Sequence, residues 1–382
     1  MLLPVNAQRI ADTFTTLCEI DSPSRHESQV AAYLTTLCRD ELKADAIYED
    51  DSASRTGSDC GNLIFRFDGD PARSPLFFNC HMDTVSPCEG VKVRFDGTVF
   101  ISSGDTILGA DDKAGITMMI EMMRVLQETN TPHAPIELIF TTCEEIGLLG
   151  AKNLDYSKIK AKMGLALDSA GVDVVVIGAP AANRFTVQIQ GLAAHAGLHP
   201  EQGINAIQLA SEAIAGLTLG RLDEESTANI GLISGGTATN IIPDQVLIHG
   251  EVRSHCENKL KQFTDNIESH FKQKVTAWRE KNPQTASPQP SFIWNISKEY
   301  PSVRLTADEP LLSLLNSAAT ALDRPLSQLI SGGGSDANIF NGHGLKTAIL
   351  GIGMTKVHTT EENISLNDLI RTTELIISAA TS

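Results

Sequence analysis

Four near-continuous apolar runs of strand length constrain the fold of this chain more than any other feature. They cover residues Leu76–Cys80, Ile136–Thr142, Met163–Leu167 and Thr347–Leu350. Runs of this kind, without alternating polar residues, are typical of parallel strands that are buried on both faces. In an open α/β sheet such strands end at a common edge, and ligands bind beyond it. The sequence therefore predicts an α/β fold with a mostly parallel central sheet.

Side chains that bind metals or transfer protons follow these runs, either directly or after a short loop. They are His81 and Asp83, Glu144 and Glu145, Asp168, and His358, and a further pair, Asp111 and Asp112, precedes an apolar segment. Each has an ordinary explanation when taken alone, because aspartates cap helices and single polar residues are common in loops. Together, two imidazoles and several carboxylates form a donor set that suits zinc, manganese or cobalt. We therefore expect a site for two divalent ions at the carboxyl edge of the sheet.

Two pairs of neighbouring acids strengthen this expectation. Glu144 and Glu145 follow a buried strand, where adjacent negative charges are unfavourable unless a cation is near or one carboxylate stays protonated. A solvated loop is the alternative explanation for this pair. Helix capping accounts for only one of Asp111 and Asp112, which precede the apolar helix expected at Ile116–Leu126.

The segments HMDT, GADDKAG, TTCEEIG, ALDSAG and VHTTEE occur in this order along the chain. Together with GGGSDAN, they resemble the co-catalytic dinuclear zinc peptidases, in particular the branch that is similar to peptidase T, the tripeptide aminopeptidases. The resemblance covers nearly the whole chain. It implies that Asp111 bridges two metal ions. The other ligands that it implies are His81 and Asp168 on one ion, and Glu145 and His358 on the second.

The same resemblance implies two catalytic roles. Glu144 is the implied general base, which takes a proton from the water between the metals and passes it to the departing amine. Asp83 is implied to orient His81, and their two-residue spacing places both side chains on one face of an extended segment. Family members also have a cis peptide after the bridging aspartate, which here is the bond between Asp111 and Asp112.

Composition argues against several classes of protein. Asp and Glu number 47 against 30 Lys and Arg, and the net charge of −17 disfavours binding to nucleic acids or anionic membranes. The chain has no stretch near the ~20 apolar residues of a membrane span, and its first residues lack the basic flank of an export signal. The seven cysteines form no CxxC pair and fit reduced thiols. We therefore expect a cytoplasmic protein without nucleic-acid or membrane partners.

The 382 residues exceed the usual size of a single domain. All predicted metal ligands lie before residue 169 or after residue 357, so we expect a discontinuous catalytic domain, residues 1–180 and 306–382, and an inserted domain, residues 181–305. The insert is expected to contain, in chain order, strand Arg184–Gln190, helix Ile204–Leu217, strands Asn229–Ile233 and Gln245–Val252, helix Glu257–Trp278 and strand Ser291–Ile296. This β-α-β-β-α-β order predicts a ferredoxin-like α+β two-layer sandwich.

Contacts with the substrate are implied mainly by the resemblance. His195, in a loop of small residues, is the implied oxyanion contact across a homodimer, in which the insert acts as a lid and dimerisation domain. Asn240 and Arg253 match positions that relatives use on the substrate, and a guanidinium suits a peptide carboxylate. A turn and a surface strand are the alternative explanations for them. Gly333 and Ser335 belong to a glycine-rich segment that lines the substrate pocket in relatives and lacks the Lys-Ser/Thr of a Walker loop.

These features predict a two-domain metallo-aminopeptidase that hydrolyses short peptides, tripeptides above all, as a homodimer. Each subunit is expected to hold two divalent ions, zinc or alternatively manganese or cobalt. An N-acyl amino acid hydrolase or a carboxypeptidase would share the metal ligands and would differ in which end of the substrate is recognised. A non-catalytic binding scaffold is a third alternative, which the complete set of ligands disfavours.

Overall fold

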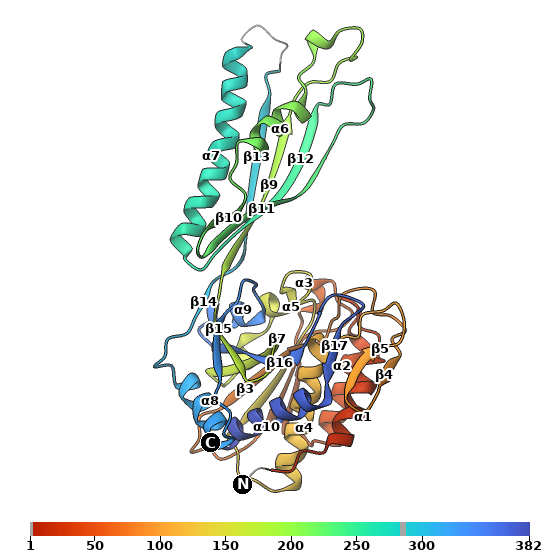
Figure 1. The fold of residues 1–382 in the computed structure, drawn as a ribbon, viewed down its shortest axis with the longest axis vertical. Helices are drawn as coiled ribbons and strands as arrows, with labels where there is room; N and C mark the ends of the chain where they lie inside the picture. Colours follow the sequence, from red (N-terminus) through yellow and green to blue (C-terminus); the bar gives the residue numbers. More distant parts are fainter. Residues whose placement is uncertain (1–2, 283–287) are drawn as a thin grey trace. The chain divides into compact units, whose positions relative to one another are not determined.

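The computed structural model describes residues 3–282 and 288–382, and the chain divides into two compact units. Unit 1 consists of Met1–Gly178 and Val303–Ser382, and unit 2 consists of Ala179–Ser302. The domain limits predicted from the sequence, at residues 180/181 and 305/306, lie within a few residues of these bounds. Figure 1 draws both units as a ribbon and labels many of their helices and strands.

Unit 1 is built around a nine-stranded sheet in the order β1-β2-β6-β3-β7-β16-β8-β14, with β15 paired to β8. The strands are β1 (Ala46–Glu49), β2 (Leu63–Phe67), β3 (Leu76–His81), β6 (Ile136–Thr141), β7 (Met163–Ala170), β8 (Val174–Ala179), β14 (Val303–Arg304), β15 (Ser327–Ile330) and β16 (Lys346–Met354). The central strands β6, β3, β7 and β16 are parallel, whereas β1 and β2 are antiparallel additions at one edge. The prediction of a mostly parallel α/β sheet is confirmed.

The four central strands coincide with the four apolar runs of the sequence. Every residue of β3 and β6 is buried, and Lys346 is the exposed residue of β16. A strand that is covered on both faces has no solvent side on which polar residues could alternate. Three of the strands, β3, β7 and β16, are longer than predicted. Because β7 continues to Ala170, Asp168 lies inside the strand near its end instead of after it.

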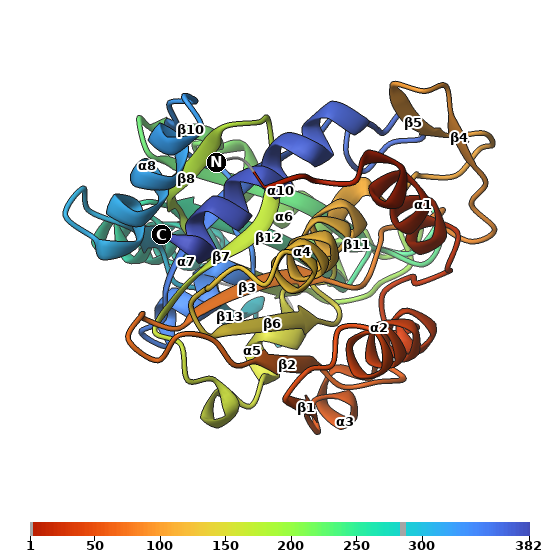
Figure 2. The same ribbon diagram turned by 90° about the horizontal axis from the view of Figure 1, so that it is seen from below.

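Helices cover this sheet. Helices α1 (Ala7–Cys18), α4 (Ala110–Glu128) and α10 (Leu366–Thr381) contact one another along one of its faces (Figure 2). The remaining elements of unit 1 are α2 (Ser28–Asp40), α3 (Ala53–Thr56), α5 (Leu149–Asn153), the 3-10 helix η1 (Tyr156–Lys158), α8 (Pro310–Ala321), α9 (Asp336–Gly342) and the small sheet β17 (Asn363–Ser365), β5 (Val99–Ser102), β4 (Val93–Phe95).

Unit 2 is a two-layer α+β sandwich with a five-stranded antiparallel sheet in the order β10-β11-β12-β9-β13. Its elements are β9 (Ala181–Gln190), η2 (Pro200–Gln202), α6 (Ala206–Ala215), β10 (Gly220–Asp223), β11 (Ser226–Gly235), β12 (Gln245–Ser254), α7 (Glu257–Lys281) and β13 (Ser291–Tyr300). The ferredoxin-like order is confirmed with one addition. Strand β10 is not predicted, because its four residues Gly-Arg-Leu-Asp carry no apolar pattern.

The long helix of unit 2 packs on the sheet through one stripe of side chains. Leu260, Ile267, Phe271 and Val275 are buried in the core of this unit, and Phe263 packs against it. The apolar residues of α7, at three- and four-residue spacings, therefore form a core face. The proline-rich segment 282–290 is predicted to be a surface loop, and its residues 283–287 lie outside the described residues.

All seven cysteines are free thiols, and Cys80 and Cys143 are buried, as expected for small core residues. Within residues 3–282 and 288–382, no helix combines the length and the apolar character that a membrane span requires.

A glycine in β7 tests the close pairing of the central strands. A Cβ atom on Gly164 would lie 2.3 Å from the carbonyl oxygen and 2.4 Å from a ring carbon of Phe77, its partner in β3. We predict that Gly164→Ala lowers the free energy of unfolding by about 1–3 kcal/mol, because strand or ring must move. Urea denaturation measures this loss as a lower midpoint. Gly104→Ala is the control, since no atom lies within 4 Å of that position. Equal midpoints for both variants would contradict the pairing.

Candidate metal centre

The five residues predicted as metal ligands come together at the carboxyl edge of the sheet in unit 1. They are His81 at the end of β3, Asp111 at the start of α4, Glu145 after β6, Asp168 near the end of β7 and His358 after β16. Ligand atoms of His81, Asp111 and Asp168 lie within 4.8 Å of one another, and so do those of Asp111, Glu145 and His358. The two groups share Asp111.

The carboxylate of Asp111 faces two imidazoles. Its Oδ1 lies 3.0 Å from Nε2 of His81, and its Oδ2 lies 3.3 Å from Nε2 of His358. The same nitrogen of His358 lies 3.0 Å from Oε1 of Glu145. Asp111 is only 7% exposed, and its peptide bond to Asp112 is cis, as the family resemblance implies. A carboxylate whose two oxygens point to two separate groups of ligands has the arrangement of a bridge between two cations.

Negative charge is concentrated at this edge. Burial raises the pKa of Glu144 and of Asp168 well above the usual range, and neighbouring carboxylates raise both further. Burial would also raise the pKa of Asp111, but its contacts with the imidazoles of His358 and His81 outweigh burial and hold that pKa below the usual range. Bonds to Asp111 and Glu145 raise the pKa of His358 to about 10. Divalent cations balance such a group of acids, so the residues present fit a metal centre.

The ring of His81 is held in one orientation. Its Nδ1 lies 2.9 Å from the main-chain oxygen of Asp83 and 3.5 Å from Oδ1 of the same residue. Both neighbours accept hydrogen bonds, so Nδ1 carries the hydrogen of the neutral ring and Nε2 is left as the free ligand atom toward Asp111. The contact between His81 and Asp83 therefore involves the main chain of Asp83 as well as its carboxylate.

The carboxylate of Asp83 also holds the turn that carries the two glutamates. Its Oδ1 accepts a hydrogen bond from the Glu144 N–H at 2.9 Å, and its Oδ2 accepts one from the Glu145 N–H at 3.2 Å. Oγ of Ser24 donates to the same Oδ2 at 2.6 Å. No pattern in the sequence predicts these contacts. One buried carboxylate thus positions both the candidate base and a candidate ligand.

A second buried carboxylate continues this support. Oε1 of Glu27 accepts hydrogen bonds from the N–H groups of Cys143 at 2.9 Å and Arg25 at 3.0 Å, and its Oε2 accepts from Oγ of Ser58. Cys143 precedes the glutamate pair and has a positive φ of 53°. The backbone N–H groups of residues 143, 144 and 145 are therefore bound in turn by Glu27 and Asp83. No pattern in the sequence marks Glu27, which lies 116 residues before Cys143.

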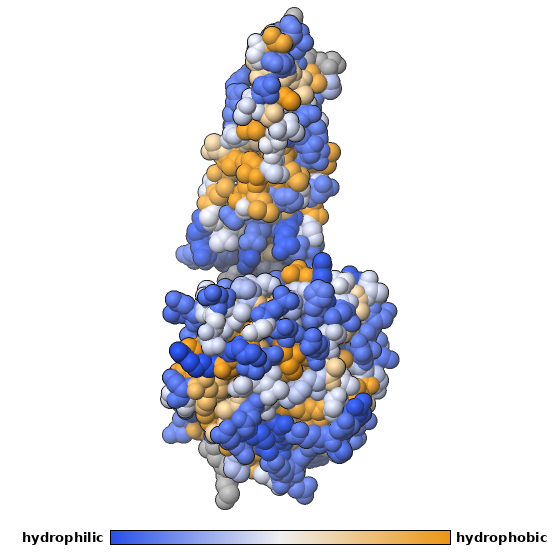
Figure 3. Space-filling view, turned by 90° about the vertical axis from the view of Figure 1, so that its right-hand side faces the viewer, coloured by the Kyte–Doolittle hydropathy of each residue, from blue (hydrophilic) through white to orange (hydrophobic). Residues whose placement is uncertain are grey.

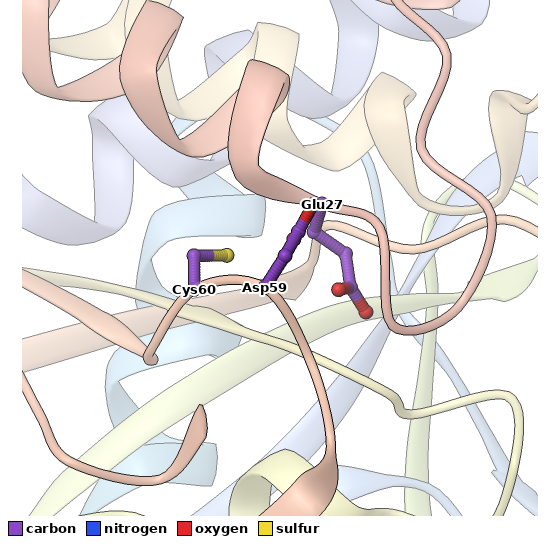
Figure 4. Close-up of side chains that lie close together, drawn as sticks. All are labelled: Glu27, Asp59 and Cys60. Atoms are coloured by element: carbon purple, nitrogen blue, oxygen red, sulfur yellow. The ribbon is translucent and has the colours of Figure 1, made fainter. Parts of the chain in front are cut away.

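Glu27 also lies beside Asp59 and Cys60. These three side chains are close enough to one another to be considered as metal ligands (Figure 4). Both oxygens of Glu27 already accept hydrogen bonds. Oδ1 and Oδ2 of Asp59 accept bonds from the N–H and Oγ of Ser28 at 2.9 and 2.7 Å. The cluster is therefore explained as a hydrogen-bonded junction of two loops.

Two further buried carboxylates border the site. Asp336 accepts a hydrogen bond from Thr141, and burial is the main cause that raises its pKa to about 6. Glu362 accepts bonds from the main chain that leads into α4. Both lie in segments that carry the family resemblance, GGGSDAN and VHTTEE, yet no role is predicted for either residue from the sequence. The acidic residues within these two family segments are the sequence feature from which their place at the site could have been predicted.

Two predicted substrate contacts lie in the loop before α9. Ser335 is the N-cap of this helix, is 5% exposed, and accepts a hydrogen bond through Oγ from the Ala337 N–H. The N–H of Gly333 donates to Oγ of Ser331 at 3.0 Å. Helix capping therefore accounts for the hydroxyl of Ser335.

The other predicted substrate contacts lie in unit 2. The loop of His195 pairs with the loop of Asn240, since the Ala196 N–H donates to the Asn240 oxygen at 2.9 Å. Arg253, on β12, forms an ion pair with Glu251 on the same strand, with 3.0 Å between Nε and Oε1. His195 and Asn240 thus form one local group in unit 2, and Arg253 belongs to the sheet.

Comparison with known proteins gives consistent results. The model of peptidase family M20/M25/M40 matches residues 77–382. The uncharacterised protein YqjE of Bacillus subtilis strain 168 is 39% identical over 375 residues, which is 98% of either chain. Aminopeptidase PepT from Bacillus cereus has a similar structure, with a TM-score of 0.89 and 38% identity over 99% of this chain and 98% of that one. A tripeptidase from Staphylococcus aureus gives a TM-score of 0.91 with 33% identity over the same shares.

The shared ligand Asp111 leads to a prediction about metal content. We predict that Asp111→Asn binds less than one divalent ion per subunit under conditions that load the wild-type protein, because a neutral amide cannot bridge two dications well. Metal analysis after gel filtration measures the content. Asp105→Asn, an exposed aspartate just before the same helix, is the control and should bind as much metal as the wild type. An unchanged metal content in Asp111→Asn would argue against the bridge.

Proposed function

Because the chain belongs to peptidase family M20/M25/M40 and is similar to a PepT aminopeptidase and to a tripeptidase, we propose that this metallopeptidase is an aminopeptidase. It removes the N-terminal residue from short peptides, tripeptides above all. The observation that carries the proposal is the pair of ligand groups that share Asp111, with Glu144 beside them. His81, Asp111 and Asp168 would hold one ion, and Asp111, Glu145 and His358 the other.

Two divalent ions, when bound, acidify the attacking water and polarise the scissile carbonyl. The protein then has to supply a base, and Glu144 is the residue proposed for this role. The main-chain N–H of Glu144 donates to the carboxylate of Asp83, which fixes the turn that carries the base. Glu144 takes the proton of the attacking water and delivers it to the amine that leaves. A carboxylate oxygen of Glu144 lies within 4.8 Å of ligand atoms of His81 and Glu145, which belong to the two proposed ligand groups.

His195 is the proposed donor to the oxyanion. Its Nδ1 accepts hydrogen bonds from the N–H groups of Gly197 and Leu198, both at 3.2 Å. In the neutral ring the hydrogen is therefore on Nε2, which is the nitrogen that can donate outward from this exposed loop. Such a donor stabilises the negative charge that develops on the carbonyl oxygen of a peptide under attack. Asn240, Arg253, Gly333 and Ser335 are the proposed substrate contacts.

We propose a homodimer that forms through unit 2. Large apolar side chains are exposed on this unit, among them Leu232 and Ile233 of β11, which are 68% and 54% exposed, and Figure 3 shows apolar side chains gathered on one of its faces. Strand β10 pairs only with Ser226–Ala228 of β11. The rest of the outer edge of β11 presents backbone groups that a second chain can pair with. Measuring the molecular mass of the protein in solution tests whether it is a dimer.

We propose zinc as the native metal, with manganese or cobalt as alternatives, since imidazole and carboxylate ligands suit all three. We propose the cytoplasm as the compartment, because seven free cysteines stay reduced there.

Substrate comparison tests the proposed activity. The metal-loaded protein is incubated with free tripeptides, with the same peptides blocked at the N-terminus, and with N-acyl amino acids. We expect release of the N-terminal residue from free peptides and little turnover of the blocked ones. Preferential hydrolysis of N-acyl amino acids would show an acylase, and release of C-terminal residues would show a carboxypeptidase. If none of the substrates is hydrolysed with any of the metals, a non-catalytic binding scaffold is the remaining alternative.

The two adjacent glutamates are expected to respond differently to the same substitution. We predict that Glu144→Gln binds as much metal as the wild type but loses activity by about a hundredfold to ten-thousandfold, since a general base contributes to rate and little to metal affinity. Glu145→Gln, its matched counterpart, should lose metal. Kinetics and metal analysis on the same samples decide between the roles. If Glu144→Gln loses metal instead, Glu144 is a ligand and the base is another group.

His195 gives a joint test of the dimer and of the chemistry. We predict that His195→Ala lowers turnover by about a hundredfold to a thousandfold without changing metal content. His199→Ala, an exposed histidine in the same loop, is the control. If His195 acts on the neighbouring subunit, mixing His195→Ala with Glu144→Ala chains should restore part of the activity. Failure to restore it despite proven subunit exchange would contradict a contact between subunits.

A further inference from the structure

The loop that carries His358 has an exposed tip and a buried base. It connects β16 to β17, and its ends are joined by two hydrogen bonds between the main chains of Thr355 and Asn363, at 3.0 and 3.1 Å. The side chain of His358 is 51% exposed, and its φ is +62°. Four residues later, Glu362 is only 1% exposed. An exposed ligand on a loop needs a fixed attachment if it is to keep its geometry.

Glu362 provides this attachment through both of its oxygens. Oε2 accepts a hydrogen bond from the N–H of Gly109 at 2.7 Å, and Oε1 accepts one from the N–H of Asp111 at 3.1 Å. The bonded residues are separated by 253 and 251 positions in the sequence. Both donor N–H groups lie in the segment that carries the shared ligand Asp111. One carboxylate therefore joins the loop of His358 to the loop of Asp111.

The direction of these bonds argues against Glu362 as a further ligand. Both oxygens point at main-chain donors, whereas a ligand would present one of them to the metal. Placing another buried acid near Asp111 is electrostatically unfavourable, because it adds negative charge to a group of carboxylates. A carboxylate is nevertheless suited to this position, since it is an acceptor only and meets two donors at once. A glutamine would offer one oxygen and would turn N–H groups toward one of the two donors.

We propose that Glu362 is a positioning residue of the metal centre: it fixes Asp111 relative to His358, so that both can bind the same ion. The proposal rests on the proposed function only in treating this group of residues as a metal site. The distance from Oδ2 of Asp111 to Nε2 of His358, 3.3 Å, depends on two segments that meet through Glu362. Metal affinity is sensitive to displacements of the ligand atoms by a few tenths of an ångström. The fold itself tolerates displacements of this size.

The test compares neighbouring glutamates in the same loop. Glu362→Gln removes the double acceptor with little change of shape. Glu361→Gln is the matched control, because Glu361 is exposed and pairs with Lys356 on the surface. Both variants and the wild type are freed of metal, and their affinities for zinc are measured by titration against a competing chelator. All titrations are done below the melting temperature of each metal-free protein, so that unfolding cannot imitate a loss of metal.

We expect the wild type and Glu361→Gln to bind two zinc ions with the same affinities. In Glu362→Gln, one of the two affinities should fall by roughly tenfold to a hundredfold, as is usual when the partner of a ligand is removed. Activity should recover at higher zinc concentration, with an unchanged KM for the peptide. Glu362→Asp should bind zinc more weakly than the wild type, because the shorter side chain cannot reach both donors.

Other results would overturn the inference. Equal zinc affinities in Glu362→Gln and the wild type would show that Glu362 is not needed for the metal geometry. A lower melting temperature of the metal-free variant, with both affinities unchanged, would show a purely structural role. If the wild type itself binds no zinc, manganese or cobalt, the proposed metal centre fails, and this outcome is distinct from the failure of Glu362 alone.

Discussion

The contact of one buried carboxylate with two imidazoles is the interaction on which the edge of unit 1 depends. Asp111 can face both His81 and His358 only if the end of β3, the start of α4 and the loop after β16 lie at the same place. A parallel sheet meets this condition, because all of its strands end at one edge. The charge of the site follows from the same geometry, since the acids that meet there need a cation or protons to balance them.

Carboxylates outside the ligand set hold the segments that carry the ligands. Asp83 and Glu27 bind the main chain of residues 143–145, and Glu362 binds the main chain of Gly109 and Asp111. These acids bind backbone N–H groups of loops and turns, which would otherwise be buried without partners. Loops alone are mobile, so precise ligands on loops require such supports. The number of acids in this region therefore exceeds the number that a metal centre needs.

The two units carry different parts of the proposed mechanism. Unit 1 contains the residues that can hold metal and move a proton, and it matches a peptidase family along most of its length. Unit 2 contains His195, whose ring is held by two backbone donors so that Nε2 is available. Its exposed apolar residues and the open edge of β11 are the basis for the proposed dimer. Such an arrangement would allow substrate recognition to change while the metal chemistry is kept.

The sequence alone determined the central strands, the order of elements in unit 2 and the residues that gather around Asp111. These features depend on local patterns, such as uninterrupted apolar runs and helical spacing, and on segments that resemble a family. Only the tertiary structure decided that Asp168 lies within β7, that β10 joins the sheet of unit 2, and that Asp83, Glu27 and Glu362 bind particular N–H groups. The reason is physical: a hydrogen bond between residues 109 and 362 leaves no periodic trace in the sequence, because it depends on where two loops meet after the chain has folded.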